Sequence, residues 1–104
     1  MSQSIVVLTT VSSEEEGGVI AKVLVEEQLA ACVNMIPKVK SFYIYEGSFC
    51  EDQEVQLLIK TNSENFIALE KMIKELHSYT LPEIIAIPIV QASKEYLSWI
   101  DQNS

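Results

Sequence analysis

A long β-hairpin is the feature that most constrains the fold of this chain. From Ala31 to Tyr45 side chains alternate with a period of two, interrupted by Pro37, which favours a bend or an edge position. Glu46-Gly47-Ser48 then forms a turn, and a second extended segment ends in EVQLLIKT, Glu54 to Thr61. Alternation on both sides of a short glycine-containing turn is typical of antiparallel strands. A hairpin spanning 39–61 is expected to protrude beyond so small a domain.

A strand and a helix are predicted before the hairpin. SIVVLTT, Ser4 to Thr10, is rich in β-branched residues and predicts a buried strand. Ser13 and Glu16 have the spacing of a capping box, which predicts a helix that ends near Gln28. The adjacent residues Gly17-Gly18 each cost such a helix about 1 kcal/mol relative to alanine. We interpret the pair as a sign that backbone approaches the helix closely.

A second helix and a last strand are predicted after the hairpin. Thr61 and Glu64 repeat the capping-box spacing, and apolar residues then recur at helical intervals as far as Leu76. TLPEIIAIPIV is rich in isoleucine and contains two prolines, so it predicts a strand that is bulged or lies at a sheet edge. Ser93 is expected to cap a short C-terminal helix.

The predicted order of elements is β-α-β-β-α-β, followed by the C-terminal helix. Two right-handed crossovers joined by a hairpin give an α+β, ferredoxin-like sandwich with four antiparallel strands and both helices on one face. The 104 residues contain no linker or repeat, so we expect residues 1–104 to form one domain.

Composition limits the partners of the chain. Hydrophobic residues make up 48% of the sequence, and because a small domain cannot bury them all, we expect self-association. The net charge of -8 disfavours nucleic acid and anionic membrane surfaces. The N-terminus lacks the pattern of a secretory signal, and no segment approaches the roughly 18 to 20 apolar residues of a membrane span. Cys32 and Cys50 are not spaced as a CxxC pair. We therefore expect a cytoplasmic protein with reduced thiols.

His77 is the only histidine and the first candidate for a functional residue. A transition-metal site usually needs three or four ligands, and His77 with Glu83 supplies two. The others would have to come from another strand or another subunit. The alternative interpretation is an imidazole at a helix C-terminus that interacts favourably with the helix dipole. A third, in which His77 is an acid or base supported by Lys60 or Tyr79, is disfavoured because the chain has no GxSxG, HExxH or Gly-rich phosphate motif.

Several segments resemble those of the CutA family of divalent-cation tolerance proteins. They occur in the family's order and cover nearly the whole chain: VVLTT, LVEEQLAACVNMIP, SFYIYEGSF, EVQLLIKT, LHSYTLPEIIAIPIV and YLSWI. The resemblance implies a ferredoxin-like fold, a homotrimer, and a role in tolerance to copper and other divalent metals. It also implies a cleft between subunits that Tyr45, Lys60 and Tyr79 line together with His77 and Glu83. Such a cleft would suit a small anionic ligand as well as a metal ion.

The chain departs from the family pattern at three positions. Tyr45 and Ser78 stand where many relatives have tryptophan and proline, and Thr9 stands where some bacterial members have a cysteine proposed to bind copper. Without that thiolate, His77 and carboxylates would favour Cu(II) or another divalent cation over Cu(I). We therefore expect a non-enzymatic, copper-binding homotrimer with no organic cofactor. The alternative is a signalling trimer similar to the PII proteins, which binds a small molecule between subunits.

Overall fold

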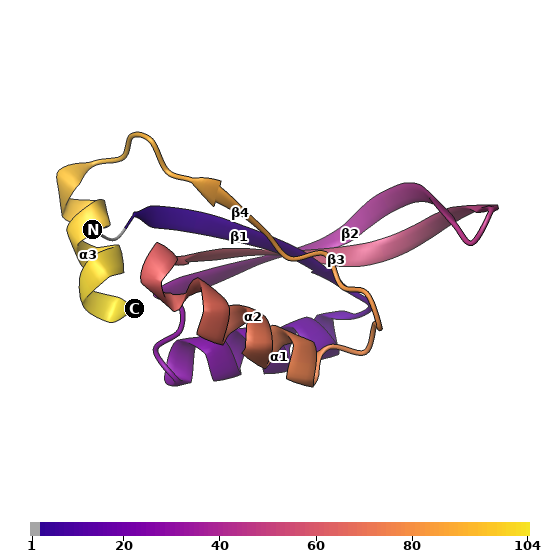
Figure 1. The fold of residues 1–104 in the computed structure, drawn as a ribbon, viewed down its shortest axis with the longest axis horizontal. Helices are drawn as coiled ribbons and strands as arrows, with labels where there is room; N and C mark the ends of the chain where they lie inside the picture. The colour runs from indigo at the N-terminus through magenta and orange to yellow at the C-terminus, as the bar shows by residue number, and fades with distance from the viewer. Residues whose placement is uncertain (1–2) are drawn as a thin grey trace.

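A four-stranded antiparallel sheet carries two helices on one face and a third helix at one end (Figure 1). The structure is a computed structural model and describes residues 3–104. The strands are β1 (Ser4–Val11), β2 (Cys32–Tyr45), β3 (Ser48–Asn62) and β4 (Ile85–Pro88); the helices are α1 (Glu14–Glu26), α2 (Phe66–Leu76) and α3 (Lys94–Asn103), with a 3-10 turn at Ser63–Asn65.

The strand order β2-β3-β1-β4 confirms the predicted ferredoxin-like topology. β1 lies inside the sheet and pairs with β3 along its whole length, from Ser4 opposite Asn62 to Val11 opposite Val55. β4 pairs with β1 only from Ile5 to Leu8. β2 and β4 are therefore the two edges, and the proline in each of them lies where a missing N–H is tolerated. No helix in the described part of the chain is long and apolar enough to cross a membrane.

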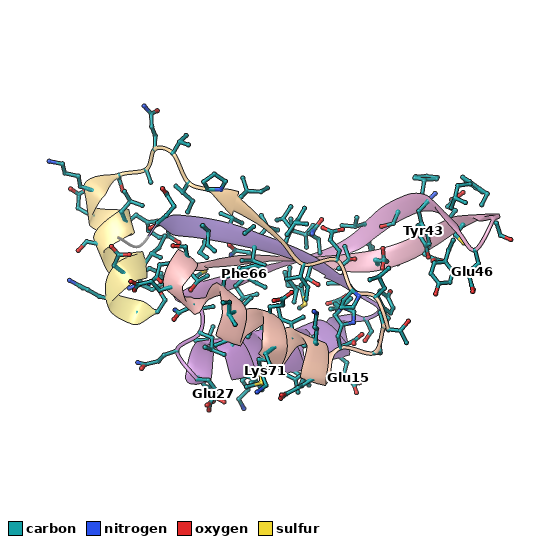
Figure 2. All side chains as sticks on the ribbon, in the orientation of Figure 1. Glu15, Glu27, Tyr43, Glu46, Phe66 and Lys71 are labelled. Carbon is teal, nitrogen blue, oxygen red and sulfur yellow. The ribbon has the colours of Figure 1, made fainter. Side chains whose placement is uncertain are left out.

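The outer part of the β2–β3 hairpin extends beyond the rest of the sheet, as predicted (Figure 1). β1 ends opposite Val55, so residues 39–54 form a two-stranded arm, beside which the described part of the chain places no third strand. The register shifts between Ile36 and Val39, where Lys38 has a φ of 62°. At the tip, Glu46 and Gly47 have φ values of 50° and 81°, as in a two-residue type I′ turn. Figure 2 shows Tyr43 and Glu46 on this arm, far from the helices.

The core lies between the sheet and helices α1 and α2. Because side chains alternate along a strand, one face of β1 and β3 is largely apolar, with Thr9 and Thr61 as its buried polar residues, and the helices cover it. Charged residues such as Glu15 and Glu27 lie on the outer side of the helical layer (Figure 2). The largest fully buried side chains of this core are Val7, Val11, Ile20, Leu24, Leu57, Ile59, Leu69 and Ile73.

Two local predictions differ from the structure. Thr61 does not cap the second helix, because its hydroxyl is buried and donates to the Leu29 carbonyl at 2.8 Å. Asn62 caps the 3-10 turn instead, accepting from the Glu64 N–H at 3.0 Å. The last strand is also shorter than the isoleucine-rich segment suggested. Only Ile85–Pro88 pairs with β1, and residues 77–84, the α2–β4 loop, are irregular.

The adjacent glycines of α1 have different surroundings, which gives a matched pair of substitutions. A Cβ on Gly17 would lie 3.0 Å from Met35 Sδ and 3.1 Å from Val11 Cγ2, whereas a Cβ on Gly18 would meet nothing within 4 Å. Gly18→Ala is expected to raise the free energy of unfolding by about 0.5–1 kcal/mol through helix propensity. Gly17→Ala is expected to lower it, since overpacking of a buried site costs roughly 1–3 kcal/mol. Urea unfolding measures both, and equal stabilisation by the two would contradict the close packing at Gly17.

Candidate functional site

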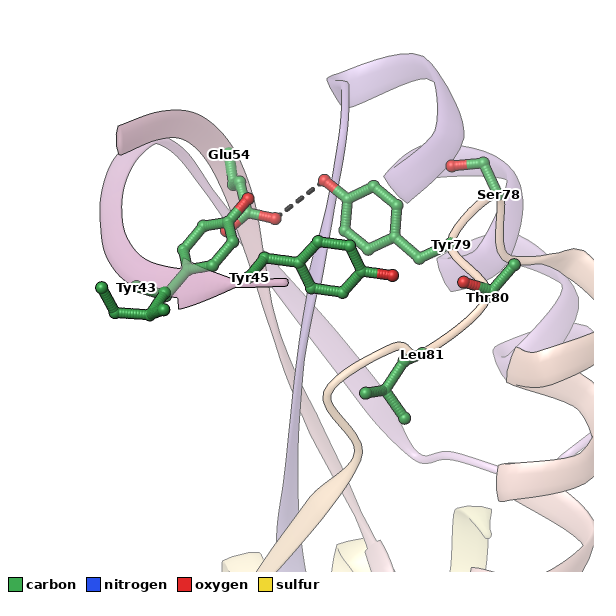
Figure 3. A pocket seen from close by; sticks show the side chains of 8 residues that line it. Tyr43, Tyr45, Glu54, Ser78, Tyr79, Thr80 and Leu81 are labelled. Atoms are coloured by element: carbon green, nitrogen blue, oxygen red, sulfur yellow. Dashed lines mark hydrogen bonds between the residues drawn. The ribbon is translucent and has the colours of Figure 1, made fainter. Parts of the chain in front are cut away.

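A pocket of about 560 Å³ lies where the arm meets the α2–β4 loop (Figure 3). The arm supplies one wall and the loop the other, so the two walls come from segments far apart in the sequence. Alternation along the strands places Tyr43, Tyr45 and Glu54 on the same face of the arm. The lining residues are Tyr43, Ile44, Tyr45, Glu54, Ser78, Tyr79, Thr80 and Leu81.

Glu54 and Tyr79 join the two walls. The Tyr79 hydroxyl donates to Glu54 Oε2 at 2.8 Å, and Figure 3 shows it pointing at that carboxylate. Glu54 is 7% exposed. Burial and the hydrogen bond to Glu54 both raise the pKa of Tyr79, so its phenol stays protonated. On the arm, the hydrogen bond from the Tyr43 hydroxyl to Asp52 raises the pKa of Tyr43 to about 12. At neutral pH the pocket therefore presents neutral tyrosines beside a nearly buried carboxyl group.

The Glu16 carboxylate connects the start of helix α1 to the α2–β4 loop. It accepts from the Ser12 N–H and hydroxyl at 3.1 and 2.7 Å. It also accepts from the Ser78 N–H and hydroxyl at 2.7 and 3.2 Å. Partial burial raises the pKa of Glu16, but these four hydrogen bonds outweigh burial and lower it from 4.5 to about 2. The predicted capping box is thus only half formed: Ser13 caps the helix, while the Glu16 side chain ties α1 to the loop.

His77 belongs to the same network. Its side chain is fully buried. Nε2 lies 2.8 Å from the Thr10 carbonyl, and because a carbonyl oxygen only accepts, Nε2 carries the proton. Nδ1 then accepts from the Tyr79 N–H at 3.1 Å and lies 3.7 Å from Glu16 Oε2. Both ring nitrogens are therefore engaged within the chain, and the imidazole orients the backbone of Tyr79.

The structure brings together only some of the residues predicted for the site. Tyr45 and Tyr79 line the pocket within one chain, whereas the predicted cleft lies between subunits. Lys60 does not line the pocket: it lies six residues further along β3 than Glu54, where its ammonium group contacts Asn34 and lies 6.0 Å from the centre of the Tyr96 ring. Glu83 is exposed. Within one chain, Lys60 and Glu83 therefore lie outside the pocket that Tyr45 and Tyr79 line. Lys60 could reach this pocket only from another subunit.

No group of three or more His, Cys, Asp or Glu residues able to hold a metal ion occurs within residues 3–104. The predicted ligand pair, His77 and Glu83, shares no hydrogen bond or ion pair there. Cys32 and Cys50 are free thiols on β2 and β3, and Thr9 is buried in the core. Within one chain these donors do not form a metal site.

Sequence reasoning missed Glu54, Glu16 and Tyr43. The period-two pattern of the hairpin could have placed Tyr43 and Glu54 on one face, because both strands alternate around the same turn. No local signal marks the contact of Glu16 with Ser78, which are 62 residues apart. The capping-box spacing even suggested a different role for Glu16.

Comparison with known proteins identifies the family. The profile described as CutA1 divalent ion tolerance protein matches residues 5–103. The chain belongs to this CutA1 family. The divalent-cation tolerance protein CutA of Thermus thermophilus is 52% identical over 99 residues, which are 95% of this chain and 96% of that protein. The structure of that CutA superimposes with a TM-score of 0.95 at 50% identity, covering 97% of this chain and 98% of the other.

Two further relatives show how widely the CutA fold occurs. The structure described as a periplasmic CutA from Archaeoglobus fulgidus has a TM-score of 0.93 at 44% identity, covering 96% of this chain and 97% of that one. The chloroplastic CutA of Arabidopsis thaliana is 41% identical over 101 residues, or 97% of this chain and 56% of that protein. The chain is thus similar in fold along nearly its whole length to divalent-cation tolerance proteins.

The low pKa of Glu16 makes a prediction about acid stability. Because the folded-state pKa of about 2 lies below the unfolded value of 4.5, the ionised carboxylate stabilises the folded chain fully above about pH 4.5. That contribution should decline below pH 4.5 and be lost as the pH falls through about 2. Glu16→Gln is expected to lower the free energy of unfolding by about 1–3 kcal/mol at pH 7, with the deficit closing towards pH 2.

Urea unfolding between pH 2 and 7 measures this deficit. Glu15→Gln is the matched control, since Glu15 is an exposed glutamate of the same helical turn. It should show no deficit that depends on pH in this way. A constant difference between Glu16→Gln and the native protein across the range would contradict the role given to the Glu16 carboxylate.

Proposed function

We propose that the chain is a non-enzymatic protein of divalent-metal tolerance that binds copper(II) or another divalent cation as a homotrimer. Membership of the CutA1 family along residues 5–103 is the observation that carries this proposal. The net charge of -8 supports it, because a negative field raises the local concentration of cations. A cytoplasmic location is part of the proposal, although the names of the Archaeoglobus and Arabidopsis relatives give periplasmic and chloroplastic locations for those proteins.

The contacts within one chain mean that metal binding at His77 and Glu83 requires a rearrangement and ligands from another subunit. Glu83 is exposed and can offer a carboxylate. His77 could bind a metal only by giving up the hydrogen bond that Nδ1 accepts from the Tyr79 N–H. Further ligands would have to come from another subunit, since no cluster of three forms within residues 3–104. This rearrangement has a free-energy cost, so the proposal implies weak or moderate affinity for Cu(II).

Calorimetric titration of Cu(II) tests the proposal. The native protein should bind, and Glu83→Ala and His77→Ala should each weaken binding by roughly tenfold or more, as expected for loss of one of few ligands. Glu95→Ala, which removes an exposed carboxylate on α3, is the matched control and should bind like the native protein. Since His77 is buried and Glu83 is not, Glu83→Ala is the variant expected to keep the fold intact. Absence of binding by the native protein, or unchanged binding by both variants, would refute this site.

The proposed homotrimer is supported by apolar surface on the arm. Phe42, Ile44 and Phe49 lie on the face opposite Glu54 and are 60–69% exposed. The Phe42 and Phe49 rings lie 6.4 Å apart, so these side chains form a continuous patch. β2 and β4 also leave open sheet edges. Pairing between subunits would cover both the apolar patch and the open sheet edges, and would thereby remove an aggregation hazard.

Light scattering after size exclusion tests the trimer. Three chains of 11.7 kDa give about 35 kDa, which is the mass expected for the native protein. The double variant Ile44→Glu, Phe49→Glu places charges in the apolar patch and should release smaller species. Ile67→Glu is the control, because Ile67 is 80% exposed on α2, away from the arm, and should leave the mass unchanged. A native mass near 11.7 kDa would exclude the trimer.

The pocket favours a second candidate function, in which the trimer binds a small molecule and signals in the manner of the PII proteins. A volume of about 560 Å³ lies within the usual range for small-molecule sites, and its lining combines aromatic rings with a few polar groups. The network of Glu16, His77 and Ser78 holds the loop wall in one position before any ligand binds. Preorganisation of this kind lowers the entropic cost of binding.

A further inference from the structure

Glu54 is a nearly buried carboxylate with no cationic side chain beside it among residues 3–104. It is 7% exposed, and its one side-chain hydrogen bond within residues 3–104 comes from the Tyr79 hydroxyl to Oε2. No lysine or histidine in that part of the chain lies within ion-pair distance of it. Removing a carboxylate from water is costly unless a counter-charge or several hydrogen bonds compensate. Within residues 3–104, Glu54 therefore lines the pocket with one oxygen, Oε1, that has no hydrogen-bond donor.

The rings around Glu54 add to the attraction for positive charge. Tyr43 and Tyr45 from the arm and Tyr79 from the loop line the same pocket, and Figure 3 shows their rings grouped beside the carboxylate. The face of an aromatic ring attracts a cation within about 6 Å. The lining contains no lysine, arginine or histidine that would oppose this. The raised pKa values of Tyr43 and Tyr79 keep both phenols neutral, and their hydroxyl groups already donate to Asp52 and Glu54, so it is the rings that face a bound cation.

We propose that this pocket binds an ammonium group, with Glu54 as its counter-ion and the Tyr43, Tyr45 and Tyr79 rings as its walls. The inference rests on the second function proposed above and names the chemical class of its ligand. It reverses the expectation of an anionic ligand, which depended on Lys60, because Lys60 lies outside the pocket of its own chain.

An organic ammonium ion suits this pocket better than a metal ion. Divalent metals need several oxygen, nitrogen or sulfur ligands, whereas Glu54 is the only carboxylate of the lining. An ammonium group needs one strong acceptor. Its other N–H groups can donate to water, and its charge is attracted to the faces of aromatic rings. Leu81 offers an apolar contact for an attached carbon chain. The ammonium group could belong to a free small amine or to a lysine of a second copy of this chain, and Lys60 is the lysine that the family resemblance places in the cleft.

Three probes of equal chain length separate charge from shape. Butylammonium, butan-1-ol and butyrate would be titrated into the native protein while NMR signals of ¹³C-labelled tyrosine rings are followed. Butylammonium is expected to shift the signals of Tyr43, Tyr45 and Tyr79 and to bind about tenfold or more tightly than butan-1-ol, as expected for a charge-assisted hydrogen bond. Butyrate should not bind. Tyr96 stacks on Trp99 in α3, outside the pocket, and its signal is an internal control that should not move.

Matched variants assign the effect to the pocket. Glu54→Gln removes the charge but can still accept from Tyr79, and it should weaken butylammonium binding about tenfold. Glu51→Gln makes the same change of net charge at an exposed site on β3 and should leave binding unaltered. Tyr45→Leu replaces a half-exposed ring and should weaken binding about threefold, as expected for loss of one cation–π contact. Because Tyr45 is a surface residue of the arm, this variant tests the site even if Glu54→Gln perturbs folding.

Lys60→Met distinguishes the two sources of the ammonium group. If a free amine is the ligand, native protein and Lys60→Met should bind butylammonium equally. If Lys60 of a neighbouring subunit occupies the pocket, only the Lys60→Met variant should bind butylammonium. That result would also support an ammonium site at Glu54. Equal binding of butan-1-ol, or binding that Glu54→Gln leaves unchanged, would overturn the ammonium site while leaving the small-molecule function standing. Failure of all three probes in both proteins would overturn the site and that function together.

Discussion

Strand β3 is the element on which the rest of the structure depends. Its inner half pairs with β1 on one side and β2 on the other, and Leu57 and Ile59 are fully buried under the helices. Its outer half continues past the end of β1, and within residues 3–104 it pairs there with β2 alone. One continuous strand thus couples the core to the arm, so the position of Glu54 is fixed by hydrogen bonds that begin in the core. A pocket wall on an isolated hairpin would lack that support, since two-stranded hairpins are only marginally stable alone.

The other wall of the pocket depends on buried polar contacts. Glu16 accepts four hydrogen bonds that connect the start of α1 to Ser78, and His77 joins the Thr10 carbonyl to the Tyr79 N–H. A loop of this length would otherwise sample many conformations. Satisfied polar networks in partly buried places stabilise one arrangement, because breaking any member leaves another group without a partner. This network places the Tyr79 ring opposite the arm.

The same network bears on the two candidate functions. The sequence favours His77 as a metal ligand because it is the only histidine and the family is associated with divalent cations. Its ring nitrogens are nevertheless both engaged, so metal binding there requires the loop to lose a contact that orders the pocket. The two proposals are therefore linked. A metal bound at His77 would disturb Tyr79, and a ligand bound against Tyr79 would strengthen the arrangement that occupies His77.

The sequence by itself determined the order of elements, the long hairpin and the apolar faces of α1 and α2. These follow from periodicity and turn chemistry, which depend on neighbours a few residues apart. It also indicated Tyr45 and Tyr79 as residues of one cleft, through family resemblance. Only the tertiary structure decided that Glu16 bonds to Ser78, that Glu54 is buried beside Tyr79, and that Lys60 lies apart from them. The physical reason is that these relations join residues from 25 to 62 positions apart in the sequence. Local patterns specify helices and strands, but which side chains then meet depends on strand register and on how the helices pack against the sheet.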